Sequence, residues 1–175
     1  MKTVAAGYYY LLVALAAIAG ATIALAFVLI VVDVGIRAAG RQPPAYTSAV
    51  VELILLYFTL LAAPYLVRRK AHVFVNVLIL RLTGRARWTM EKIAYSVCVA
   101  TALTFAYVGF GLMIEGIQSG SFEDRSIDVP LWVAYAPLGP IFLLVAIEFG
   151  RYLIGIDSLY VDRVKVDRVK TPDGL

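Results

Sequence analysis

Long runs of apolar residues, separated by charged or turn-forming residues, divide the sequence into four segments. The first run, residues 3–32, carries no charge between Lys2 and Asp33 and predicts a helix over residues 8–32. The other runs predict helices over residues 47–67, 93–114 and 129–147. A helix needs about 20 apolar residues to cross the hydrocarbon core of a bilayer. The pattern therefore predicts an all-α, polytopic membrane protein with four transmembrane helices in a single domain, residues 1–175.

A cleaved secretory signal is the alternative interpretation of the first run, because Ala24-Leu25-Ala26 resembles a cleavage site. The apolar residues continue to Val32, far beyond the roughly 7 to 15 residues of a signal core. We therefore expect a retained helix.

Prolines predict local features of the fourth helix. Pro130 suits the first helical turn, where its missing N–H costs nothing. Pro137, Gly139 and Pro140 near the middle remove two backbone donors, so we expect a kink or local unwinding there.

Composition agrees with a membrane protein and excludes several functions. The chain is 62% hydrophobic and 16% charged, with a mean hydropathy of +0.85. Its loops leave no room for a soluble catalytic or nucleic-acid-binding domain. A single cysteine, Cys98, cannot form an internal disulfide, and a single histidine, His72, cannot supply both axial ligands of a haem. We expect no enzyme activity, no catalytic or metal site and no cofactor.

The distribution of Lys and Arg predicts the orientation, since basic residues near the spans stay on the cytoplasmic side. Of the 16 basic residues, 13 lie before the first helix, between the second and third, or in the tail, residues 151–175. The loop after the third helix is acidic. Both termini are therefore expected in the cytoplasm.

The connection between the second and third helices contains a further apolar segment, residues 71–82. Twelve helical residues span only about 18 Å, too short to cross the bilayer. We predict a short interfacial amphipathic helix, anchored by Trp88. A strand is the alternative, but an unpaired strand would leave backbone groups unsatisfied.

Ionisable groups inside a span are the usual sign of an ion pathway, and here they are scarce. Glu52 is the carboxylate that lies well inside an apolar run, near the outer end of the second helix. It can serve coupling, substrate binding or a structural ion pair. Asp33, Glu115 and Glu148 lie at span ends, where a charge costs little.

Two stripes of small residues allow close helix approach in lipid. Each stripe repeats every four residues and suits either this chain's own bundle or a partner. The stripes are Ala16, Gly20 and Ala24 in the first helix and Ser96, Ala100 and Thr104 in the third. The basic residues Arg68 and Arg69 suit anionic phospholipid headgroups.

The same positions resemble a known family, the small membrane subunit of tripartite ATP-independent periplasmic (TRAP) transporters. That family has four helices with cytoplasmic ends, a Glu near the start of the second, and a basic stretch leading into a His-Val-x-Val/Ile-Asp motif. The matching positions here are Glu52, Arg68, Arg69, His72, Val73, Val75, Asn76 and the segment 128–139. The chain differs at Asn76, where the family usually has an acid, and at Pro140, where an apolar residue is more common.

The resemblance implies a non-catalytic subunit that scaffolds a large membrane transport subunit in the bacterial inner membrane. The large subunit would take up an organic acid with sodium, and a periplasmic substrate-binding protein would deliver that acid. The small-residue stripes and Glu52 would face the large subunit, and Arg69, His72 and Asn76 would contact phospholipid or the partner. The alternatives are a homo-oligomeric transporter or channel that uses Glu52, the small subunit of another tripartite carboxylate transporter, and, last, a membrane enzyme.

Overall fold

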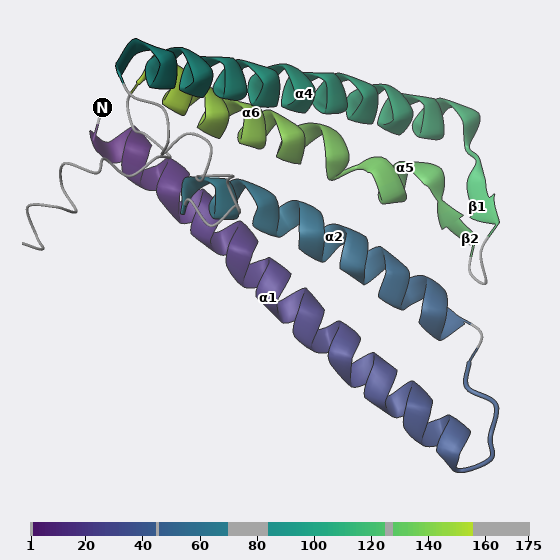
Figure 1. Cartoon of the computed structure of the whole chain (residues 1–175). Helices are drawn as coiled ribbons and strands as arrows, with labels where there is room; N and C mark the ends of the chain where they lie inside the picture. Colours follow the sequence, from purple (N-terminus) through teal and green to yellow (C-terminus); the bar gives the residue numbers. More distant parts are fainter. Residues whose placement is uncertain (1, 45, 70–83, 125–127, 156–175) are drawn as a thin grey trace, which may run out of the picture.

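The computed structural model describes residues 2–44, 46–69, 84–124 and 128–155, which are mostly helical (Figure 1). The elements are α1 (Lys2–Ala38), α2 (Tyr46–Arg68), α4 (Gly84–Ser119), β1 (Phe122–Asp124), β2 (Asp128–Pro130), α5 (Leu131–Tyr135) and α6 (Leu138–Ile154). Four helical segments are long and apolar enough to cross a membrane, α5 and α6 together making the fourth. The predicted all-α membrane fold is confirmed. The interfacial helix predicted over residues 71–82, with His72 and Asn76, lies outside the described residues.

The helices are longer than the apolar runs that predicted them. α1 has 37 residues, or about 55 Å, against about 30 Å of hydrocarbon. α4 has 36 residues and extends beyond the predicted 93–114 at both ends. Polar residues continue a helix into the headgroup region, so hydropathy marks the hydrocarbon crossing and not the helix ends.

A short hairpin precedes the fourth span, and it corrects the predicted start of that helix. β1 pairs antiparallel with β2, with Phe122 opposite Pro130. We predicted helix from residue 129 with Pro130 in the first turn, which was wrong. Pro130 ends β2 with an extended ψ of 132°, and the N–H of Leu131 donates to the carbonyl of Ser121 (3.0 Å). The hairpin thus satisfies backbone hydrogen-bonding groups that precede the helix.

The fourth span is interrupted as predicted, between Tyr135 at the end of α5 and Leu138 at the start of α6. Pro137 has no N–H to continue the helical ladder, while its carbonyl accepts from Ile141 (3.1 Å) and begins α6. The span then runs to Ile154, so residues 151–154, which we assigned to the tail, are helical.

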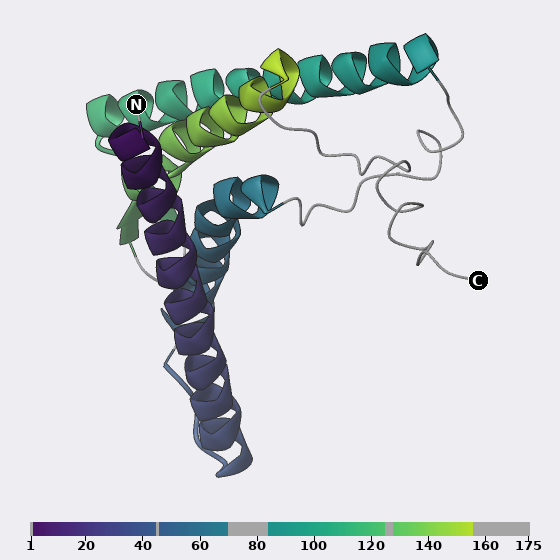
Figure 2. The ribbon, with the colours of Figure 1, turned by 90° about the vertical axis from the view of Figure 1, so that its left-hand side faces the viewer.

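The helices pack as neighbours in the order α1, α2, α6, α4, with α5 also against α4. Figure 2 shows the α1–α2 pair inclined to the α4–α6 pair. The start of α1 and the end of α6 lie at the same end of the bundle (Figure 1). This placement agrees with an even number of crossings.

The buried face of α1 repeats every seven residues and consists of Leu12, Ala19 and Ala26, each 1% exposed or less. Since α2 is the main neighbour of α1, this face forms the α1–α2 contact. The Ala16–Gly20–Ala24 stripe is therefore not the principal packing face within the chain.

Two glycines of α4 allow its close approach to the fourth span. A Cβ on Gly109 would lie 2.7 Å from the backbone nitrogen of Gly139, and one on Gly116 would lie 2.8 Å from that of Trp132. Both distances are too short for any side chain. The interrupted segment thus packs backbone against backbone on α4, and Gly139 in turn faces the ring of Phe110.

Candidate functional site at the helix ends

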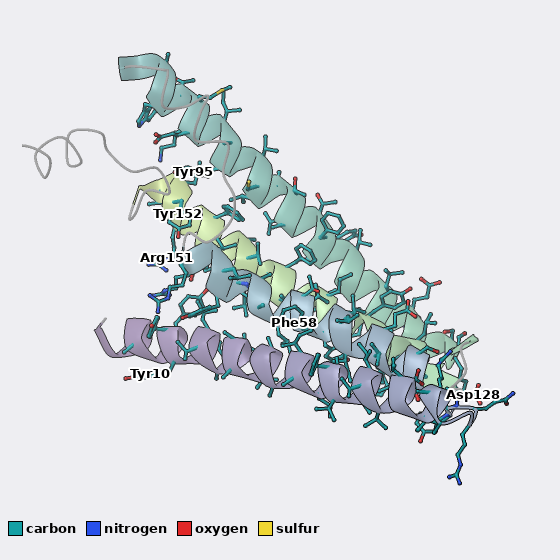
Figure 3. The ribbon with its side chains drawn as sticks, turned by 60° about the horizontal axis from the view of Figure 1, so that its bottom comes forward. Tyr10, Phe58, Tyr95, Asp128, Arg151 and Tyr152 are labelled. Atoms are coloured by element: carbon teal, nitrogen blue, oxygen red, sulfur yellow. The ribbon has the colours of Figure 1, made fainter. Side chains whose placement is uncertain are left out.

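The ends of α1, α2 and α6 meet around one carboxylate, that of Glu148 in α6. Its side chain is 1% exposed, although it is charged and lies only two turns from the end of its helix. Figure 3 shows Arg151 and Tyr152 at this end of α6, near the ends of α1 and α2. We name Glu148, Arg68 and Arg151 the ion-pair cluster.

Two guanidinium groups share the Glu148 carboxylate. Nη1 of Arg68 donates to Oε1 (3.2 Å), and Nη1 of Arg151 donates to Oε1 (3.2 Å) and Oε2 (2.9 Å). The side chain of Arg68 is 22% exposed and that of Arg151 is 31% exposed. The carboxylate is therefore shielded from solvent, whereas both arginines remain partly accessible. With two cations and one anion the cluster carries a net charge of +1.

Aromatic rings of α1 complete the cluster. The Arg68 guanidinium lies 5.5 Å from the ring centre of Tyr8 and 5.2 Å from that of Tyr9, within cation–π range. The Tyr8 hydroxyl oxygen is buried close to the Glu148 carboxylate, outside hydrogen-bond geometry. The start of α1 is thereby tied to α2 and α6.

Hydrogen bonds to main-chain carbonyls brace the same end. The Tyr152 hydroxyl donates to the carbonyl of Val67 (3.0 Å) and, at 3.4 Å, to that of Arg68. Nζ of Lys92 on α4 donates to the carbonyl of Leu153 near the end of α6. The rings of Tyr95 and Tyr152 lie 6.0 Å apart (Figure 3). All four membrane-length segments therefore contribute to this end of the bundle.

The cluster has chemistry suited to holding helices and attracting an anion. Arginine stays charged and presents planar N–H donors. Among the described residues, no group of three or more His, Cys, Asp or Glu could hold a metal ion.

The predicted candidate Glu52 lies at the opposite end, on the exposed side of α2. It lines an open groove of about 330 Å³ between α1 and α2, together with Ser48, Asp33 and Arg37. Asp33 and Arg37 form an ion pair of 2.8 Å one turn apart on α1. Glu52 and the ion-pair cluster are thus separate sites at opposite ends of the bundle.

The predicted small-residue stripes are largely uncovered. Ala16 is half-buried, whereas the other five members are exposed: Gly20, Ala24, Ser96, Ala100 and Thr104. A Cβ added to Gly20 would meet no atom within 4 Å. The stripes are therefore not buried by the described residues of this chain.

The predicted basic pair separates in the structure. Arg68 joins the ion-pair cluster, while Arg69 donates through Nε to the Tyr65 hydroxyl (2.9 Å) and lies over the Tyr65 ring. That hydrogen bond raises the pKa of the Arg69 guanidinium above its ordinary value.

The placement of Glu148 at a span end was predicted correctly, but the conclusion that its charge costs little there was wrong. Packing of three helices removes the carboxylate from water, and the cost is offset by two arginines. Arg151 and Tyr8 were also missed as members of the site. The three-residue spacing of Glu148 and Arg151 was the available signal.

The comparison with known families decides the identity of the chain. Residues 26–155 match the family described as "Tripartite ATP-independent periplasmic transporters, DctQ component". The chain belongs to the DctQ family. The match begins within α1 and ends just after α6. It therefore includes all three residues of the ion-pair cluster but not Tyr8 and Tyr9 of α1.

Membership in the DctQ family identifies the small membrane component of a TRAP transporter, as the resemblance predicted. It is a transporter-component family and not an enzyme family. No curated protein and no solved structure matches the chain.

Proposed function

We propose that this DctQ protein is a non-catalytic scaffold that steadies the large membrane subunit of its transporter. That subunit would carry out sodium-coupled uptake of an organic acid, which a periplasmic binding protein delivers. The family supports a place in a tripartite transporter. The scaffold role rests on the surfaces of the outer helices.

The observation that carries the proposal is the uncovered faces of α1 and α4. α1 packs on α2 through Leu12, Ala19 and Ala26, while Gly20 and Ala24 remain exposed. Ala100 and Thr104 on α4 are likewise exposed. In lipid, small residues favour helix association by allowing the backbones to approach closely. These two faces are therefore suited to a partner helix.

The positions of the charges agree with a subunit that does not transport by itself. Within the described spans, charged residues lie near the helix ends: Asp33, Arg37, Glu52, Arg68, Glu91, Lys92, Glu115, Glu148 and Arg151. Secondary transporters commonly bind substrate and coupling ions near the middle of the bilayer. The described parts of this chain supply no charged group there.

The test is to tag the chain, extract it from its native membrane in mild detergent and identify bound proteins by mass spectrometry. One large polytopic membrane protein at near-equal stoichiometry is the expected result. Recovery of a homo-oligomer without a large partner would contradict the scaffold role.

A second candidate function is transport by a homo-oligomer of this chain through the Glu52 groove. The groove of about 330 Å³, with Glu52, Ser48 and Asp33 on its walls, favours it. Glu52→Gln would then abolish substrate uptake by vesicles containing the purified chain alone. Uptake that requires the large subunit would exclude this function.

A further inference from the structure

We propose that Arg68 and Arg151 bind the phosphate group of a membrane phospholipid, and that Glu148 positions the two guanidinium groups for it. The residues of this site differ from the small-residue faces that we propose for the large subunit. It requires the chain to lie in a membrane but does not depend on the scaffold role.

The first support is unbalanced charge. One carboxylate serves two guanidinium groups, which leaves a net charge of +1 inside a largely buried cluster. All hydrogen bonds that these arginines donate to described residues use an Nη1 atom. The other N–H groups donate to none of the described residues, and a planar guanidinium matches the oxygens of a phosphate.

The second support is geometry. Glu148 holds both guanidinium groups at 2.9 to 3.2 Å, so they lie next to each other although α2 and α6 are far apart in sequence. The Tyr8 and Tyr9 rings restrict Arg68 further. Groups held in place before binding lose less conformational entropy when the ligand arrives.

The third support is depth in the bilayer. On α1, 25 residues separate Tyr8 at the cluster from Asp33 near the opposite end, which corresponds to about 38 Å of helix. The hydrocarbon core is about 30 Å thick. The cluster therefore lies at headgroup level, where phospholipid phosphates are the most abundant anions.

The fourth support distinguishes a lipid from a free anion. Apolar side chains close along the chain to the cluster are exposed: Leu11 (47%), Leu66 (40%) and Ile154 (78%). Acyl chains attached to a bound phosphate can cover such side chains, whereas inorganic phosphate cannot. The combination of charge and apolar surface therefore favours a phospholipid.

The experiment uses the purified, delipidated full chain in detergent and measures binding of dioctanoyl-phosphatidylglycerol by calorimetry. We expect saturable binding that Arg68→Gln and Arg151→Gln each weaken about tenfold, since each removes charged hydrogen bonds to phosphate. Arg37→Gln, at the opposite end, is the matched control and should leave binding unchanged. Inorganic phosphate at equal concentration should not compete, and full competition would assign the site to free anions and overturn the lipid assignment.

Two further variants separate binding from structure. Arg151→Lys keeps the ion pair with Glu148 but removes the planar donors, so we expect weaker lipid binding by a folded chain. Glu148→Gln removes the carboxylate that positions both guanidinium groups, so we expect a folded chain that binds the lipid severalfold more weakly. Unchanged or tighter binding by a folded Glu148→Gln variant would contradict the positioning role, and equal binding by the wild type and a folded Arg68→Gln/Arg151→Gln variant would overturn the proposal. Copurification of the large subunit tests the scaffold role and is measured separately from lipid binding.

Discussion

The Glu148 carboxylate on α6 accepts a hydrogen bond of 3.2 Å from Arg68 at the end of α2, 80 residues earlier in the chain. This contact joins the α1–α2 pair to the α4–α6 pair. Because Glu148 is 1% exposed, the interaction is not weakened by water in the way that a surface ion pair is.

Replacing Glu148 by Ala should destabilise the chain by roughly 3 kcal/mol, because two partly buried guanidinium groups would lose their counter-charge. The midpoint of thermal unfolding in mild detergent measures the effect. Asp33→Ala is the control, since its partner Arg37 is 64% exposed and such pairs contribute less than about 1 kcal/mol. Equal shifts in both variants would contradict a special role for the ion-pair cluster.

Gly109→Ala should destabilise the packing of α4 on the fourth span by about 1 to 3 kcal/mol, the usual cost of overpacking. The added Cβ would lie 2.7 Å from the backbone nitrogen of Gly139, which cannot move like a side chain. Gly111→Ala on the same helix is the control, because its Cβ would meet no atom within 4 Å. It should be neutral or slightly stabilising. Unfolding midpoints of the two variants provide the comparison.

Two neighbouring residues of α1 should separate folding from assembly. Ala19→Leu inserts volume into the α1–α2 contact, where Ala19 is 1% exposed, and should lower the unfolding midpoint of the isolated chain. Gly20→Leu should leave that midpoint nearly unchanged and reduce copurification of the large subunit. Unchanged copurification would remove the Gly20 face from the proposed contact.

Tyr152→Phe should cost about 1 kcal/mol, because the buried hydroxyl bonds the carbonyl of Val67 at the end of α2. Tyr107→Phe is a matched control with an 82% exposed side chain. We expect its unfolding midpoint to equal that of the wild type. A similar decrease in both variants would mean that loss of a tyrosine hydroxyl, and not this bond, is responsible.

Reporter fusions should place the β1–β2 hairpin on the side opposite both termini. The start of α1 and the end of α6 lie at one end of the bundle, and the hairpin lies at the other (Figure 1). Most basic residues flank the first end, so we expect the termini in the cytoplasm. A cytoplasmic signal from a reporter inserted after Gly120 would reverse this orientation.

Much of the fold could be predicted from the amino-acid sequence. Apolar runs located all four spans, because lipid allows no charge or unpaired backbone group in its core without compensation. The proline pair Pro137 and Pro140 located the interruption of the fourth span for an equally local reason, the missing N–H. The helix ends and the β1–β2 hairpin were harder to predict from the sequence, since polar residues at the membrane interface suit both helix and loop.

The packing faces and the ion-pair cluster were decided by tertiary structure. In a membrane helix nearly every side chain is apolar, so a stripe such as Ala16, Gly20 and Ala24 satisfies the same rule as the stripe that is actually buried. Likewise Glu148 lies at a span end in the sequence, and only the approach of α2 and α1 encloses it. Whether a helix can cross a bilayer depends on its own residues. Whether one of its side chains is buried depends on which helix packs against it, and that packing is determined by all the helices of the bundle together.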